Sequence, residues 1–174
     1  MVKFIQLVAF VAAVALPAAA VDICFYSNAL GCSGPSGCCT NLAVNNCCGP
    51  ADTALGFSLQ YSDLPNLTTG QAWTSDRCSP ANTGIRTFQN GPGNKCWNGG
   101  GLRAASAAWS FGTGGKLAPS GDASAACRSF DSFKYPDADG VEQTIHIGDG
   151  QSFKQLQALY DAGDFEALAA LKDN

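Results

Sequence analysis

The stretch CFYSNALGCSGPSGCCTNLAVNNCC, residues 24–48, decides the fold because it holds six of the nine cysteines in the chain. Gly, Asn and Ser are frequent between these cysteines, so the stretch has little apolar surface of its own to bury. Disulfides would restrict its unfolded state and stabilise the folded one by about 2–4 kcal/mol each. The stretch therefore predicts a fold that depends on oxidised cysteines.

The amino terminus predicts the compartment in which these cysteines oxidise. Lys3 precedes an apolar run from Phe4 to Leu16, and Pro17 and three alanines ending at Ala20 follow it. This order is typical of a secretory signal peptide cleaved after Ala20, and the run is shorter than the ~20 residues that a membrane span needs. Residues 171–174 are polar, which excludes a lipid-anchor signal. We expect a secreted, extracellular protein with no membrane span, in which disulfides persist.

The cysteine spacing predicts four disulfides without choosing their partners. Two doublets occur, and neighbouring cysteines rarely bond to each other, so each doublet should reach two different segments. The eight cysteines expected to pair allow 105 pairings; they are Cys24, Cys32, Cys38, Cys39, Cys47, Cys48, Cys78 and Cys96. Cys127 is the expected leftover because it lies beyond a linker, either buried or paired with another molecule. No zinc-type C-x2-C spacing occurs, so we expect no metal.

The remaining pattern predicts a mainly β fold: a small disulfide-stabilised antiparallel sandwich or barrel with a short C-terminal helical tail. Short strand-like segments separated by turns fill residues 21–111, which we assign to a cysteine-rich β domain after the signal peptide of residues 1–20. Residues 112–123 form a Gly/Pro/Ser linker. Residues 124–174 hold one strand near Ile145 and two short helices, capped by Ser152 and Asp164, that should pack on the β domain.

Composition and motifs exclude several function classes. Removal of the signal leaves nine Lys and Arg against 14 Asp and Glu, and this net charge of −5 argues against nucleic acid as a partner. The single histidine, His146, lies in a predicted strand, and no nucleophile-elbow motif occurs, so we expect no catalytic residues and no cofactor. Asn66-Leu67-Thr68 is the only N-glycosylation sequon. Trp97 is a candidate for stacking on a sugar ligand, with core packing as the commoner role of such a ring.

The run Ile23-Cys24-Phe25-Tyr26, the two doublets and the segment Cys96-Trp97-Asn98-Gly99-Gly100-Gly101 resemble the small secreted cysteine-rich proteins of fungi. The resemblance covers residues 1–111 and implies a protein without a known activity. We therefore expect a non-enzymatic secreted protein that binds at a cell surface or on another organism. The sequence does not identify its extracellular ligand, and polysaccharide and protein are the two candidate partners. The alternatives are a carbohydrate-binding or cell-wall module and a small secreted hydrolase.

Overall fold

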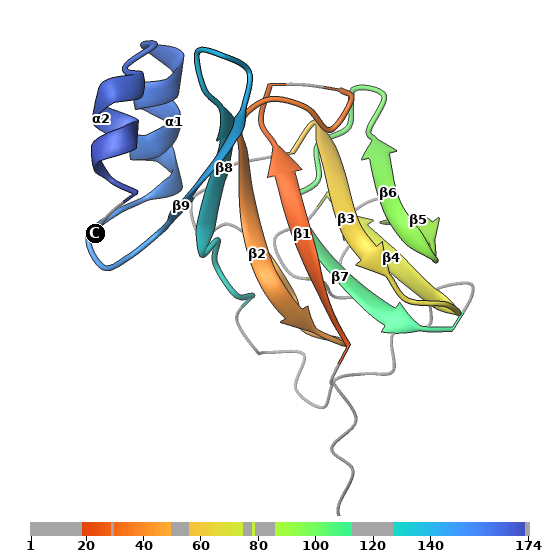
Figure 1. Cartoon of the computed structure of the whole chain (residues 1–174). Coiled ribbons are helices and arrows are strands. Elements are labelled where there is room, and N and C mark those ends of the chain that lie inside the picture. The colour runs from red at the N-terminus through yellow and green to blue at the C-terminus, as the bar shows by residue number, and fades with distance from the viewer. Residues whose placement is uncertain are drawn as a thin grey trace, which may run out of the picture.

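A computed structural model describes residues 19–28, 30–49, 56–74, 78, 86–112 and 127–172, with the backbone only at positions 86 and 88. Two antiparallel sheets face each other, and two short helices lie beside one of them (Figure 1). This arrangement confirms the predicted mainly β, disulfide-stabilised fold with a helical tail. The first strand among the described residues starts at Ala20, the residue at which the signal peptide is expected to end. Residues 1–18 of that signal lie outside the described residues.

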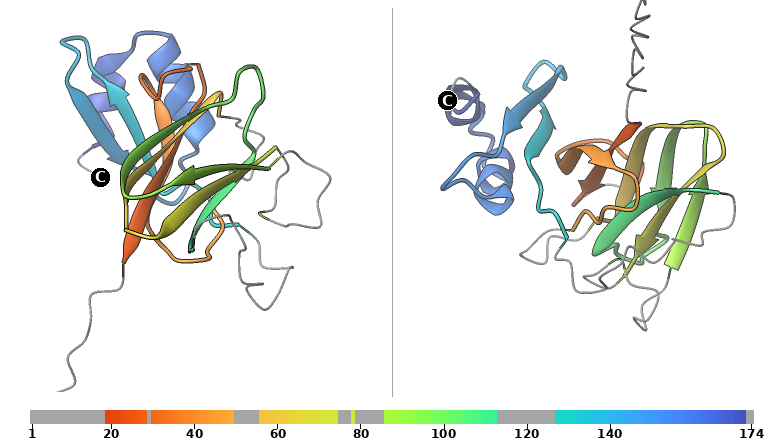
Figure 2. Two further views of the ribbon diagram at one scale, coloured as in Figure 1. Left: turned by 90° about the vertical axis from the view of Figure 1, so that its right-hand side faces the viewer. Right: turned by 90° about the horizontal axis from the view of Figure 1, so that it is seen from below.

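The larger sheet has six strands in the order β6-β3-β1-β2-β8-β9. These strands are β1 (Ala20–Tyr26), β2 (Ser36–Ala43), β3 (Ser58–Leu64), β6 (Gly93–Asn98), β8 (Ser132–Pro136) and β9 (Glu142–His146). The smaller sheet has the order β5-β4-β7, and comprises β4 (Thr68–Trp73), β5 (Arg86–Asn90) and β7 (Ser106–Phe111). Figure 2 shows that the smaller sheet covers only part of the larger one.

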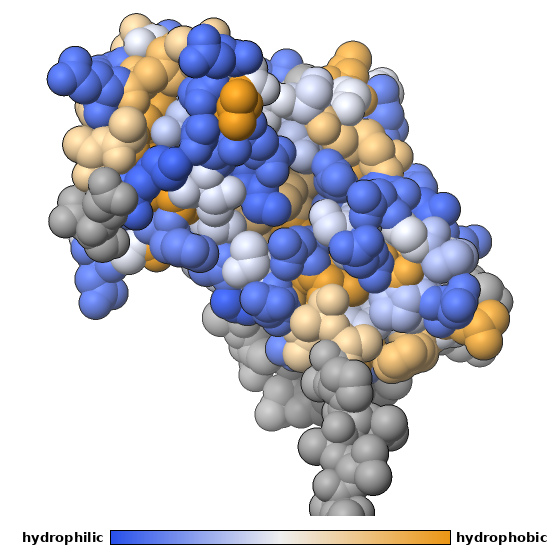
Figure 3. Space-filling model, viewed as in Figure 1, coloured by the Kyte–Doolittle hydropathy of each residue, from blue (hydrophilic) through white to orange (hydrophobic). Residues whose placement is uncertain are grey.

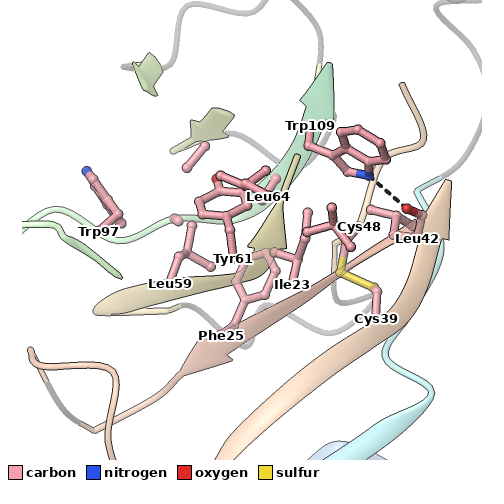
Figure 4. Close-up of a cluster of buried hydrophobic side chains, with 14 of the residues drawn as sticks. Ile23, Phe25, Cys39, Leu42, Cys48, Leu59, Tyr61, Leu64, Trp97 and Trp109 are labelled. Carbon is pink, nitrogen blue, oxygen red and sulfur yellow. Dashed lines mark hydrogen bonds between the residues drawn. A yellow bond between two sulfur atoms is a disulfide. The ribbon is translucent and has the colours of Figure 1, made fainter. Parts of the chain in front are cut away.

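The main core lies between the two sheets and is drawn in Figure 4. Ile23 and Leu59 from the larger sheet are fully buried, as is Trp109 from the smaller one. The indole nitrogen of Trp109 donates a 2.7 Å hydrogen bond to the backbone oxygen of Leu42, which joins the sheets across the core. Burying a large aromatic side chain contributes strongly to stability, and satisfying its polar atom removes the penalty for burying it.

The two helices form where the sequence predicts them. Helix α1 (Phe153–Asp161) begins with a capping box, in which Ser152 and Gln155 each bind the other's backbone N–H. Gly163 has a φ of 70°, a left-handed conformation that ends the helix, and Asp164 caps α2 (Phe165–Ala170). Leu156 and Leu168 are buried against Phe133 of β8 and Ile145 of β9, so the helices pack on the β8–β9 part of the larger sheet.

Two strands of the larger sheet, β2 and β8, have no counterpart in the sequence-based prediction. Strand β2 reads SGCCTNLA, whose glycine and small polar residues hide the alternation of a strand. Strand β8 pairs with β9 as a hairpin and with β2 on its other side, so the tail contributes two strands where one was expected. The segment that starts at residue 127 therefore belongs to the same sheet as β1 and β3. Residues 113–123 of the predicted linker lie outside the described part of the chain.

Candidate functional site

Two disulfides tie β2 to neighbouring segments. Cys24 of β1 bonds to Cys38 of β2, where the two residues face each other in the strand register. Cys39, the next residue along β2, points to the opposite face of the sheet and bonds to Cys48 in the main core. The alternation of side chains along a strand thus explains the first doublet. It also confirms that neighbouring cysteines serve different partners.

The second doublet leads to a cluster of three sulfur atoms. Cys48 is buried in the disulfide to Cys39, whereas Cys47 lies at bonding distance from both Cys78 and Cys127. Cys127, the expected leftover, therefore lies beside Cys47 and Cys78. The linker before it does not separate it in space, because Arg128 donates its backbone N–H to the carbonyl of Cys47 at 2.8 Å. We name Cys47, Cys78 and Cys127 the sulfur cluster.

The Cys32–Cys96 disulfide holds together one end of the larger sheet. Cys32 lies in the β1–β2 loop, and its backbone N–H donates to the hydroxyl of Ser58 at the start of β3. The backbone N–H of Gly99 donates to Phe57, and Gly56 pairs with Ala104. These contacts join three loops, whose described residues are 27–28 and 30–35, 56–57 and 99–105, at the upper end of the sheet in Figure 1. We call this surface the stapled end.

The stapled end presents apolar and cationic side chains to solvent. Leu30 is 51% exposed and Leu102 is 38% exposed. The guanidinium of Arg103 lies 3.8 Å from the centre of the half-buried Phe57 ring, a cation–π contact that fixes its position. Polar side chains dominate the molecular face seen in Figure 3, where apolar ones form small patches. Exposed leucines on a cross-linked backbone provide a contact surface that loses little conformational freedom on binding.

The other residues singled out from the sequence are dispersed. Trp97 is only 7% exposed and belongs to the main core, and its role in ligand stacking stays a prediction. Asn66 is exposed in the turn between β3 and β4, and its glycosylation stays a prediction as well. His146 is exposed at the end of β9, where it pairs with Ser132 in the strand register.

The acidic side chains whose contacts are described hold neighbouring segments together or cap turns and helices. Asp131 accepts hydrogen bonds from the backbone N–H and hydroxyl of Thr40 and forms an ion pair with Arg128, which attaches the segment before β8 to β2. In the β8–β9 turn, hydrogen bonds from the Gln143 side chain and the backbone N–H of Val141 lower the pKa of Asp137.

Burial is the main cause of the pKa shifts of two tyrosines, Tyr61 and Tyr26. Loss of solvent raises the pKa of Tyr61, whose hydroxyl lies in the core and has no hydrogen-bond partner among the described residues. Burial, with a smaller contribution from the negative charge of Glu142, also raises the pKa of Tyr26, whose hydroxyl donates to Gln60 at 2.8 Å. Both side chains therefore stay neutral at physiological pH and act as packing groups.

Two facing antiparallel sheets, with disulfides that cross-link strands and loops of the larger one, define a disulfide-stabilised β domain. The chain belongs to the ARB_05566_N family, described as an N-terminal domain, whose family model matches residues 22–137. The match runs from β1 to β8 and is consistent with a fungal protein. No curated protein and no solved structure matches the chain. Among the described residues, neither helix has the length and apolar character needed to cross a membrane.

Proposed function

We propose that this protein is a secreted, non-enzymatic binding protein that attaches to a cell surface or another organism through the stapled end. The feature that supports this proposal is the exposure of Leu30 and Leu102, together with Arg103 positioned over Phe57, at the end of the sheet that the Cys32–Cys96 disulfide holds together. Aromatic and arginine side chains held in a fixed geometry are frequent anchors of binding energy.

The rigidity of these loops supports binding without catalysis. The disulfide and the backbone hydrogen bonds fix the loops before any ligand arrives, so little ordering entropy is lost when one binds. The acidic residues whose contacts are described hold strands, turns and helix ends, as Asp131, Asp137 and Asp164 do. A fixed contact surface therefore accounts for the arrangement better than a pair of reacting carboxylates.

The test is retention of the exported, tagged protein on insoluble chitin, on insoluble β-glucan and on intact cells. We expect retention on at least one of these surfaces. The double variant Leu30→Asp/Leu102→Asp should weaken it at least tenfold, because charges would replace two apolar contacts. Leu67→Asp is the matched control: Leu67 is 74% exposed, but it lies in the turn after β3, at the other end of the strand.

Each outcome of this assay bears on the proposal. Retention on a polysaccharide that the double variant loses assigns the protein to the carbohydrate-binding alternative, with the same surface in use. Loss that occurs only on cells indicates a protein partner. Equal retention of the wild type and the double variant would refute the stapled end as the contact surface. Release of soluble sugars from either polysaccharide would favour the hydrolase alternative and reject a purely binding role.

A further inference from the structure

The sulfur cluster cannot be fully bridged within one chain. Three disulfides use six of the nine cysteines, and the three that remain have their sulfur atoms within 4.8 Å of one another. Cys47 contacts both of the others, yet a cysteine sulfur forms one disulfide at a time. The Cys47–Cys78 and Cys47–Cys127 bridges are therefore alternatives. Whichever of them forms, the third cysteine of the cluster is a thiol that lies next to that disulfide.

We propose that the sulfur cluster is a thiol–disulfide exchange site, in which one disulfide moves between Cys47–Cys78 and Cys47–Cys127. The thiol that is left captures an external low-molecular-weight disulfide. This inference is independent of the proposed binding role, because it concerns a different part of the molecule. It assigns a covalent modification site to a half-buried cluster.

The internal step is balanced and needs no oxidant. The thiolate of the cysteine outside the bridge attacks the sulfur of Cys47, a new S–S bond forms, and the previous partner leaves as a thiolate. The external step follows the same chemistry with a disulfide RSSR as co-reactant. The protein thiolate attacks one sulfur of RSSR, a mixed disulfide forms, and RS⁻ leaves and takes up a proton.

The backbone geometry permits both bridges. The Cα atoms are 5.7 Å apart for Cys47–Cys78 and 4.6 Å apart for Cys47–Cys127, and disulfides span about 4.4–6.8 Å. Exchange therefore requires side-chain rotation and no large movement of strands.

Cys47 is held in the middle of the cluster. The next residue, Cys48, forms a disulfide to Cys39 and exchanges backbone hydrogen bonds with Ala107. The two alternative partners of Cys47 come from different segments of the chain. Cys78 follows β4 and donates its backbone N–H to the Cys47 sulfur at 3.3 Å, while Cys127 precedes β8. The exchange would thus determine which of these two segments is tied to the end of β2.

The cluster is partly open to solvent. All three cysteines are of intermediate exposure, so a small disulfide can reach the reactive sulfur. Thiolate is the attacking species, so both exchange and capture should accelerate as the pH rises.

Tryptic mapping of the full-length exported protein tests the proposal directly. Cleavage after Lys and Arg places Cys78 in peptide 78–86 and Cys127 in peptide 117–128, with one cysteine in each. Rapid alkylation after denaturation in acid, where exchange is slow, records the resting populations. We expect one alkylated cysteine per chain, divided between the two peptides. Incubation with glutathione disulfide at about pH 8 should add one reducible glutathionyl group per chain.

Alkylation of the native protein to completion distinguishes exchange from a fixed mixture. If the bridge moves, the final ratio of the two labelled peptides depends on the size of the maleimide, because every molecule can react through its more accessible thiol. If the two disulfide forms do not interconvert, the two labelled peptides would appear in their resting ratio with every reagent. Cys78→Ser and Cys127→Ser are the matched variants: each retains one closed bridge, so each should lose both alkylation and glutathionylation.

Four results would overturn the proposal. Label confined to one peptide would mean that a single fixed disulfide forms. A ratio independent of the reagent would rule out movement. A covalent dimer without alkylation would show pairing between chains. A bound metal ion, with three alkylated cysteines after its removal, would identify the cluster as a thiolate metal site.

Discussion

Gly37 lies at the centre of the larger sheet, and replacing it with alanine should destabilise the protein through one identifiable contact. In β2 it pairs with Phe25 of β1 on one side and with Phe133 of β8 on the other. Directly paired residues of antiparallel strands project to the same face. The missing side chain of Gly37 leaves room on that face for the ring of Phe130, which an added Cβ atom would meet inside contact distance.

The neighbouring rings make this contact hard to relieve. Phe130 packs against Phe25 at 5.2 Å and against Phe153 of α1 at 5.3 Å between ring centres, and the added Cβ would also lie 2.8 Å from the Phe153 ring. The strand itself is held between two neighbours, so the rings would have to move. Overpacking of this kind typically costs about 1–3 kcal/mol. For a domain of this size, that loss lowers the melting temperature by roughly 2–12 °C.

The assay is unfolding by denaturant in the absence of reductant, monitored by tryptophan fluorescence. Gly148→Ala is the matched control, because nothing lies within 4 Å of its added Cβ, and it should change stability little. The double variant Gly37→Ala/Phe130→Leu should lose less than the sum of the single losses, with a coupling of about 0.5–3 kcal/mol. Additive losses, or a Gly37→Ala protein as stable as the wild type, would refute the assigned contact.

Two further predictions concern Asp137 and Trp97. Because hydrogen bonds lower the folded-state pKa of Asp137, its contribution is present above the ordinary aspartate pKa and disappears as the pH falls through the lowered value. Urea unfolding should therefore separate the wild type from Asp137→Asn at neutral pH, with the difference vanishing in acid; a constant difference would contradict this origin. Trp97→Ala should cost about 3–5 kcal/mol as a loss of core packing. A stable Trp97→Ala protein that no longer binds chitin would instead support the stacking role.

The sequence predicts those parts of the fold that carry a local signal. Ser152 followed by Gln155 is a recognisable capping box, and Gly163 before Asp164 marks the end of one helix and the start of the next. The same holds for strand β3, where Leu59 and Tyr61 alternate with polar residues. Each of these signals depends on residues close together in the chain, so one sequence suffices to read it.

The parts that escape sequence-based prediction depend on distant contacts. Gly37 weakens the strand signal of β2, and only its position under Phe130 explains why a glycine is present there. Likewise, nothing local places Cys127 beside Cys47, because 79 residues intervene in the sequence. The stapled end also depends on contacts between segments that are distant in the sequence. Its loops come from three separate segments, and only the Cys32–Cys96 disulfide and the strand register bring them together.

The helical tail follows from the width of the larger sheet. Three strands of the smaller sheet cannot cover six, and the inner faces of β8 and β9 carry Phe133, Tyr135 and Ile145, all of which are buried. Leu156 and Leu168 of the two helices supply the apolar surface that covers them. Phe130 lies where the two covering layers meet, in contact with Phe25 of the main core and Phe153 of α1. The smaller sheet and the helices therefore cover neighbouring parts of the same face, and Gly37 leaves the space for the Phe130 ring between these two covering layers.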